Sequence, residues 1–410
     1  MIIPVIVFIV VLFGYALVSQ RLEQTVLTAP MVFTLAGMIM FPFLPDLLQA
    51  GFNANLFLHI AELGLVMLLF TDASRTDFAS LRNIKSLPIR LLTTGLLLTI
   101  VLGTVIARLV FRDLTLWEAG ILATILAPTD AGLGQVIVNS PLVPSRVRQA
   151  LNVEAGLNDG LSVPFLLFFI ALAAARIVGV PQSLALFIGQ QLGLGLVVGA
   201  AIGLEGGWLL GWAHRRDWVS PQFQQIGVVA LPLLCMVVSE IAGASMFIAA
   251  FVAGLTVQFG FKTAGQHSVE FAEEWGQLFN LTVFFLFGVV ILKDWPMYTP
   301  AIVLYAILSL TVVRMIPVAI ALIGTRLSPA SVMFMGWFGP RGLASIVLGL
   351  VYLEEGLYLP GESTTRLAVI ATVALSIFAH GLSAMPGIRL YARKIASLPP
   401  DAPEQLKLPA

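Results

Sequence analysis

Charged side chains are rare in this chain, and a few of them fall inside its long apolar stretches. Asp130, Glu154, Asp159 and Arg341 are the members of this group on which chemistry could rest. A charge near the centre of a bilayer is costly, so each one needs an opposite charge or a water-filled path. A carboxylate in such a place offers oxygens for which a proton and a metal ion can compete. That competition is the chemistry of ion exchange.

The spacing of these residues places their charges at similar depth. The stretch that carries Asp159 starts near Arg146, so at 1.5 Å per residue Asp159 lies about 20 Å along a helix, near mid-membrane. Glu154 and Asn158 are four residues apart and share one helix face, whereas Asp159 is turned by about 100° from Asn158. One face can therefore hold a structural pair while the next points into a cavity.

Two apolar stretches are interrupted in a comparable way, at residues 127–132 (APTDAG) and 338–342 (FGPRG). Each break carries one charge, Asp130 or Arg341, at about the depth of Asp159. The two stretches are the fifth and the twelfth, so they run in opposite directions through the membrane. Paired breaks of opposite direction are typical of transporters built from inverted repeats, with the site where the breaks meet. Backbone carbonyls freed around Thr129 could then serve as oxygen ligands for a hard cation.

The composition predicts a polytopic membrane protein. The chain has 410 residues, of which 59% are hydrophobic and 11% charged, and 22 basic residues balance 22 acidic ones. These values exclude a nucleic-acid binder, a disordered chain and an ordinary soluble enzyme. The single cysteine excludes a disulfide framework. No phosphate loop, nucleophile elbow or zinc-protease motif is present, so we expect no enzyme and no cofactor.

Thirteen apolar stretches are long enough to cross a bilayer as helices. Together they predict an all-α transmembrane domain over residues 1–396, followed by a short cytoplasmic tail over 397–410. The stretches cover residues 3–18, 27–44, 56–73, 88–110, 115–138, 146–175, 183–213, 222–239, 243–259, 277–293, 298–324, 330–352 and 364–391.

The distribution of Lys and Arg predicts the orientation in the membrane. Fifteen of them fall in loops after odd-numbered stretches, and four or five in loops after even-numbered ones. Because cytoplasmic loops carry the excess, the C-terminus is expected in the cytoplasm and the N-terminus outside.

These residues resemble the monovalent cation/proton antiporter superfamily, in the branch with an Asn-Asp pair on the sixth helix, which includes archaeal and bacterial sodium/proton antiporters. The resemblance covers nearly the whole chain, and its five segments are more specific together than any one alone. They are Glu62 to Arg82, the Thr129-Asp130 break, Glu154 to Asp159, Met246 to Leu255, and Phe338 to Ser345.

The resemblance implies a set of ion-binding residues. Asp159 would be the carboxylate that alternately binds the proton and Na⁺ or K⁺, and Asn158 would hold the site together. Asp130 and Thr129 would complete the site where the two broken helices cross. The sequence departs from some relatives at Ala155, where those members supply a side-chain oxygen and alanine cannot.

The resemblance also implies a structural pair and a division of the fold. Glu154 would pair with Arg341, as in the branch that exchanges ions without net charge movement. A core bundle, about residues 88–175 and 298–391, would move against scaffold helices that form a homodimer. The expected location is the cell membrane of a bacterium or archaeon.

Two further acids flank the cytoplasmic end of the third stretch. Asp72 and Asp77 could line an acidic access funnel or could be ordinary helix-cap or loop residues. The sequence leaves these two interpretations equally open.

The leading functional hypothesis is electroneutral exchange of protons for Na⁺ by alternating access. The alternatives are K⁺/H⁺ exchange at the same site, ion-coupled symport of an organic solute, and a channel or non-transporting sensor.

Overall fold

The computed structural model describes residues 2–22, 25–43, 54–75, 86–178, 189–261, 265–354, 359–399 and 402–404. In these residues all the regular structure is helical, with short 3₁₀ and π segments between some of the α-helices. The predicted all-α class is therefore confirmed. The α-helices are α1 (Ile2–Leu22), α2 (Ala29–Met40), α4 (Ala54–Ser74), α6 (Ser86–Arg90), α7 (Leu96–Val110), α8 (Leu116–Ile125), α9 (Ala131–Val138), α10 (Ser145–Val178), α12 (Gly195–Arg215), α13 (Pro221–Ala242), α14 (Met246–Val257), α15 (Gly265–Lys293), α16 (Pro300–Leu310), α17 (Val312–Ala321), α18 (Pro329–Trp337), α19 (Leu343–Glu354) and α20 (Glu362–Ile395).

Each of the thirteen predicted stretches overlaps at least one of these helices. Within the described residues, nine helices are long and apolar enough to cross a membrane, and four apolar helices are shorter. The short ones include α8, which ends at the first predicted break, and α19, which begins after the second. The number of helices that cross the bilayer stays a prediction.

The chain divides into two compact units. The first contains residues 1–58, 79–158 and 281–410, and the second contains residues 59–78 and 159–280. The predicted core bundle and scaffold helices stay predictions.

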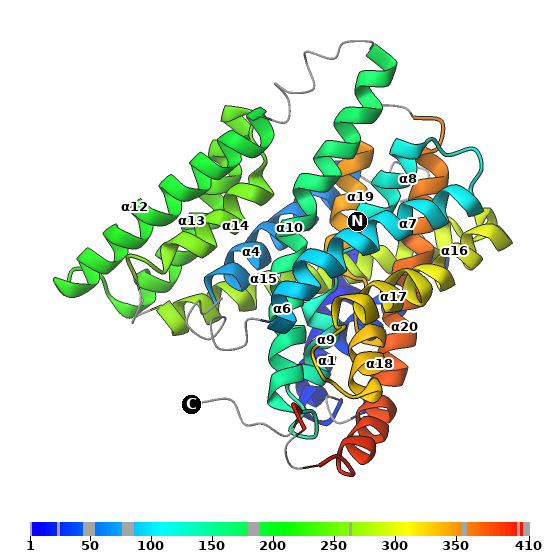
Figure 1. Ribbon diagram of the computed structural model, residues 1–410. Coiled ribbons are helices and arrows are strands. Elements are labelled where there is room, and N and C mark those ends of the chain that lie inside the picture. The colour runs from blue at the N-terminus through cyan, green and yellow to red at the C-terminus, as the bar shows by residue number, and fades with distance from the viewer. Residues whose placement is uncertain are drawn as a thin grey trace. The chain divides into compact units, whose positions relative to one another are not determined.

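In the second unit, glycines on one face of α12 allow a close approach to α14, and Figure 1 shows the two helices with α13 as neighbours. A Cβ at Gly199, Gly203 or Gly207 would overlap backbone atoms of residues 249, 253 and 257. Small residues at four-residue spacing are typical of helix pairs packed in membranes. The packing of this unit therefore depends on residues without side chains.

In the first unit, both predicted breaks are observed. The chain is non-helical at residues 126–130, between α8 and α9, and at 338–342, between α18 and α19. Each break contains a proline, Pro128 or Pro340, which lacks an N–H and disfavours helical geometry in the preceding residue. The long helix α20 packs against α8, α9, α18 and α19, so one element contacts the helices on both sides of both breaks. Figure 1 shows α18 and α20 side by side.

The described part of the tail is attached to the start of α18. The Glu404 carboxylate accepts hydrogen bonds of 2.7 Å from the Ser328 N–H and from the Ser331 hydroxyl. Tyr391 on α20 donates to the same Ser331 hydroxyl at 2.7 Å. Burial raises the pKa of the Glu404 carboxyl, but the bonds from Ser331 and Ser328 outweigh it and hold the pKa below its ordinary value.

We expect this contact to depend on the charge of Glu404. Because the folded pKa is depressed, the contact stabilises the docked tail fully above the ordinary glutamate pKa and is lost as the pH falls through the lowered pKa of the folded state. A spin label at Ala402 should therefore be immobilised at pH 5 to 8 and mobile at lower pH. In Glu404→Gln it should be mobile throughout, and the control Glu362→Gln should match the parent protein. A label equally immobile in Glu404→Gln would contradict the role of this charge.

Candidate ion-binding site

The two breaks contact each other through Asp130. The Asp130 N–H donates to the Pro340 carbonyl at 2.7 Å. One carboxylate oxygen of Asp130 accepts from the Leu133 N–H and the other from the Leu343 N–H, both at 2.7 Å. Leu133 is in the first turn of α9 and Leu343 is the first residue of α19. One carboxylate therefore caps two helix N-termini, where free N–H groups and the helix dipole favour negative charge.

Gly342 makes this arrangement possible because the Asp130 carboxylate lies directly against its Cα. A Cβ at position 342 would overlap that carboxylate. Glycine is therefore required here for close approach and not for backbone conformation.

Arg341 binds carbonyls that follow the C-terminus of α8. Its side chain is fully buried, and its Nη1 donates to the carbonyls of Ala127 and Pro128 at 3.0 Å each. These carbonyls follow the C-terminus of α8, where the helix dipole places partial negative charge. The two break charges of the sequence thus lie at helix ends of opposite sign.

Glu154 pairs with a different arginine from the one expected. Its two carboxylate oxygens accept from Nη1 and Nη2 of Arg314 on α17, at 2.5 and 2.9 Å, and both side chains are buried. The expected pairing with Arg341 is corrected to Arg314. The physical reason lies in the breaks: Arg341 is directed to the α8 carbonyls, and the absence of a side chain at Gly339 leaves room for the Arg314 guanidinium. The sequence shows Arg314 inside an apolar stretch but does not indicate its partner.

Asn158 ties α10 to the first break. Its Nδ2 donates to the Thr129 hydroxyl oxygen at 2.7 Å, and both residues are buried. The Asn158 side-chain carbonyl oxygen has no hydrogen-bond partner among the described residues. A buried oxygen without a donor nearby is suited to a cation or to a water that hydrates one.

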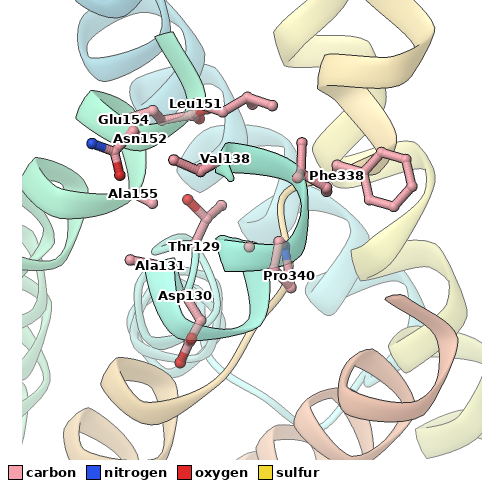
Figure 2. A pocket seen from close by; sticks show the side chains of 12 residues that line it. Thr129, Asp130, Ala131, Val138, Leu151, Asn152, Glu154, Ala155, Phe338 and Pro340 are labelled. Atoms are coloured by element: carbon pink, nitrogen blue, oxygen red, sulfur yellow. The ribbon is translucent and has the colours of Figure 1, made fainter. Parts of the chain in front are cut away.

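A small cavity of about 20 Å³ lies between α10 and the first break. Thr129, Asp130, Glu154, Ala155 and Pro340 contribute to its wall. Figure 2 shows the Thr129 side chain directed toward Ala155 and the Asp130 carboxylate directed away from Ala155. A space of this size holds about one water molecule. The cavity therefore suits a single small species, and Ala155 offers it no oxygen.

A profile of the family described as "Sodium/hydrogen exchanger, transmembrane" matches residues 7–388. The chain belongs to this family. It is similar in fold to the sodium proton antiporter MjNhaP1 from Methanocaldococcus jannaschii, with a TM-score of 0.75, 21% identity, and coverage of 97% of this chain and 99% of that one. The predicted superfamily is thereby confirmed, and the chain is an integral membrane protein.

Curated relatives of this exchanger-family chain include antiporters for both cations. The chain is 27% identical over 318 residues to a Na(+)/H(+) antiporter of Schizosaccharomyces pombe, covering 68% of this chain and 65% of the relative. It is 26% identical over 338 residues to the K(+)/H(+) antiporter NhaP2 of Shewanella sp. (strain ANA-3), covering 81% and 57%. The chain thus spans about three fifths of the length of these relatives.

Of the remaining predicted site residues, Asp159 lies on α10 and Asp72 on α4. In this exchanger-family chain Asp159 directly follows Asn158 on α10 and is half-buried, and its backbone carbonyl accepts from the Ser162 hydroxyl at 2.8 Å. Asp72 is half-buried near the end of α4, and Asp77 lies outside the described residues. The predicted acidic funnel therefore stays a prediction.

The Glu154–Arg314 pair generates a stability prediction. Arg314→Met leaves a buried carboxylate without its partner and should lower the free energy of unfolding by about 3–5 kcal/mol. Adding Glu154→Met removes the isolated charge and should restore most of the loss. Thermal unfolding of the purified protein in detergent measures both effects.

The matched control is the more exposed pair formed by Arg75 and Glu273 in the second unit. Arg75→Met should cost no more than about 1 kcal/mol, because water solvates both charges. A double variant no more stable than Arg314→Met would contradict the pairing.

Proposed function

We propose that this protein is a secondary active antiporter that exchanges protons for a monovalent cation, with Asp159 as the carboxylate that binds each in turn. The observation that carries the proposal is the Asp130 carboxylate, which joins two broken helices beside a water-sized cavity and α10. Broken helices that meet at a small polar site are the arrangement expected of an ion-coupled transporter. The named activities of the curated relatives support the same reaction.

The assignment of Asp159 comes from the resemblance to the exchanger family, and the contacts of the two neighbouring acids give those two a structural part. Both oxygens of Asp130 accept backbone N–H groups, and both oxygens of Glu154 accept from Arg314. Their charges are therefore committed to the fold. Asp159 is the next carboxylate on α10, one position after the Asn158 that binds Thr129.

A single exchanging carboxylate would make the transport electroneutral. If Asp159 crosses the membrane either protonated or with one cation bound, the site has the same net charge in both crossings. The Glu154–Arg314 pair adds no net charge, because its charges cancel. The proposed stoichiometry is one proton for one cation, with Asn158 and Thr129 holding the site and water completing the ligand shell.

For the transport cycle we propose alternating access by an elevator movement. The moving core would contain residues 88–175 and 298–391, and the remaining helices would form the scaffold of a homodimer. The N-terminus would lie outside the cell and the C-terminus in the cytoplasm, as the distribution of Lys and Arg indicates.

Na⁺ is the proposed cation and K⁺ the alternative, because antiporters for each occur among the relatives. Symport of an organic solute is disfavoured by the cavity of about 20 Å³, which holds about one water molecule. A titration of Na⁺, K⁺ and Li⁺ against the same proton gradient distinguishes the cations.

Asp159→Asn tests the central role. In proteoliposomes with an imposed pH gradient, Na⁺ or K⁺ should dissipate the gradient through the parent protein, because its carboxylate releases a proton when the cation binds. Asparagine cannot make this exchange, so the response should be abolished. The matched control is Glu205→Gln, which removes a carboxyl group from α12 outside the site and should retain exchange. Full exchange by Asp159→Asn would overturn the assignment.

Ala155→Ser tests the contribution of the cavity wall to selectivity. The added hydroxyl would supply one more oxygen, which small cations use better than K⁺ does. The KM for Na⁺ or Li⁺ should fall about fivefold relative to that for K⁺, as expected for one new polar contact. The control Ala173→Ser places the same hydroxyl farther along α10 and should leave the ratio unchanged. An unchanged ratio in Ala155→Ser would show that residue 155 does not face the ion.

A further inference from the structure

The two helix breaks create four helix ends, and the site described above accounts for three of them. Asp130 caps the N-termini of α9 and α19, and Arg341 binds carbonyls beyond the C-terminus of α8. The fourth end is the C-terminus of α18, at Trp337. Free carbonyls at a buried helix end need donors, so this end requires a partner as well.

Two donors come from elsewhere in the first unit: the Gly339 N–H donates to the Trp337 carbonyl at 2.9 Å, and the Arg314 Nη2 donates to the Met335 carbonyl at 3.4 Å. The helix α20 adds His380 and Ser376. The His380 Nε2 lies 2.9 Å from the Trp337 carbonyl. One helical turn earlier, the Ser376 hydroxyl oxygen accepts from the Arg341 N–H at 2.6 Å and lies 3.0 Å from the His380 Nδ1. Both side chains are buried, with 2% and 0% of their surface exposed.

The chemical groups at the ends of each hydrogen bond limit which atom can donate. The Trp337 carbonyl can only accept, so the His380 Nε2 carries a hydrogen. The Arg341 N–H can only donate, so Ser376 accepts it and its own hydrogen is available to the His380 Nδ1. The His380 Nδ1 also lies 3.0 Å from the Ser376 backbone carbonyl, which can only accept. The Nδ1 can therefore accept from the Ser376 hydroxyl or donate to this carbonyl.

The network holds both sides of the second break. Trp337 is the last residue of α18, and Arg341 lies two residues before α19. Between them is Pro340, whose carbonyl accepts the Asp130 N–H. Two residues after Arg341 is Leu343, whose N–H donates to the Asp130 carboxylate. The segment that holds Asp130 is thus itself held at both ends by one face of α20.

We propose that His380 and Ser376 are positioning residues of the ion site. Through the 337–341 segment they hold Asp130 in place, and with it the adjacent Thr129, which lines the cavity and binds Asn158. This inference deepens the proposed antiport, because it assigns to α20 a part in binding the cation. It predicts that loss of the network weakens the binding of the cation more than it slows its transport.

Two measurements on the full-length protein test the proposal. Hydrogen exchange reports the geometry directly: in His380→Phe, which keeps a ring but no hydrogen-bonding group, amides in 127–133 and 338–344 should exchange about tenfold faster. In proteoliposomes the KM for Na⁺ should rise about tenfold with kcat changed less than twofold, as is typical when a residue that orients a ligand is removed. Ser376→Ala should act in the same direction. His380→Gln, which keeps an N–H donor for the Trp337 carbonyl, should recover part of both losses.

The matched control is Thr372→Val on α20. It removes a buried hydroxyl that donates only within the helix, to the Ala368 carbonyl at 2.7 Å. It should leave both exchange and KM unchanged. Equal effects of Thr372→Val and His380→Phe would overturn the proposal, because they would show a general loosening of α20. Unchanged exchange rates in His380→Phe would overturn it as well, and so would faster exchange with an unchanged KM.

Hydrogen exchange also separates this proposal from the proposed function. If the parent protein transports neither Na⁺ nor K⁺, antiport fails. The positioning of Asp130 by His380 is then decided by the exchange rates alone.

Discussion

The structure of the first unit depends on one carboxylate that two helix ends share. Asp130 accepts N–H groups from the starts of α9 and α19, and its own N–H binds the break that precedes α19. In the low-dielectric interior of a membrane protein, free N–H groups at a helix start are costly unless an acceptor meets them. Because a single carboxylate caps both helix N-termini, moving either break away from it would leave N–H groups at a helix start without an acceptor.

The other charges follow the same electrostatic rule. Arg341 donates to carbonyls that follow the end of α8, and the His380 ring lies 2.9 Å from the carbonyl at the end of α18. Glu154 and Arg314 cancel each other. The fold thus balances these charges locally.

Close approach is the second requirement of this arrangement. Gly342 admits the Asp130 carboxylate and Gly339 admits the Arg314 guanidinium, so the FGPRG segment has glycine on each side of the Pro-Arg pair. Proline supplies the break, and the glycines supply the space for the charged groups. The FGPRG segment therefore leaves room for two side chains from elsewhere in the chain, those of Asp130 and Arg314.

Much of the fold could be predicted from the chain because it depends on local properties. Apolar length predicted the helices, Pro128 and Pro340 predicted the breaks, and the four-residue spacing predicted that Glu154 and Asn158 share one face of α10. The structure adds that this face lies toward the first break, because Asn158 binds Thr129 and Glu154 lines the cavity beside it. The partner of Glu154 could not be predicted in this way. Arg314 and Arg341 carry the same charge and both lie in apolar stretches, so the sequence does not distinguish them. The packing of α17 and α20 against the breaks decided that Arg314 binds Glu154 and that His380 contacts the Trp337 carbonyl. Only the tertiary structure shows such contacts, because they depend on where helices far apart in the sequence come together in space.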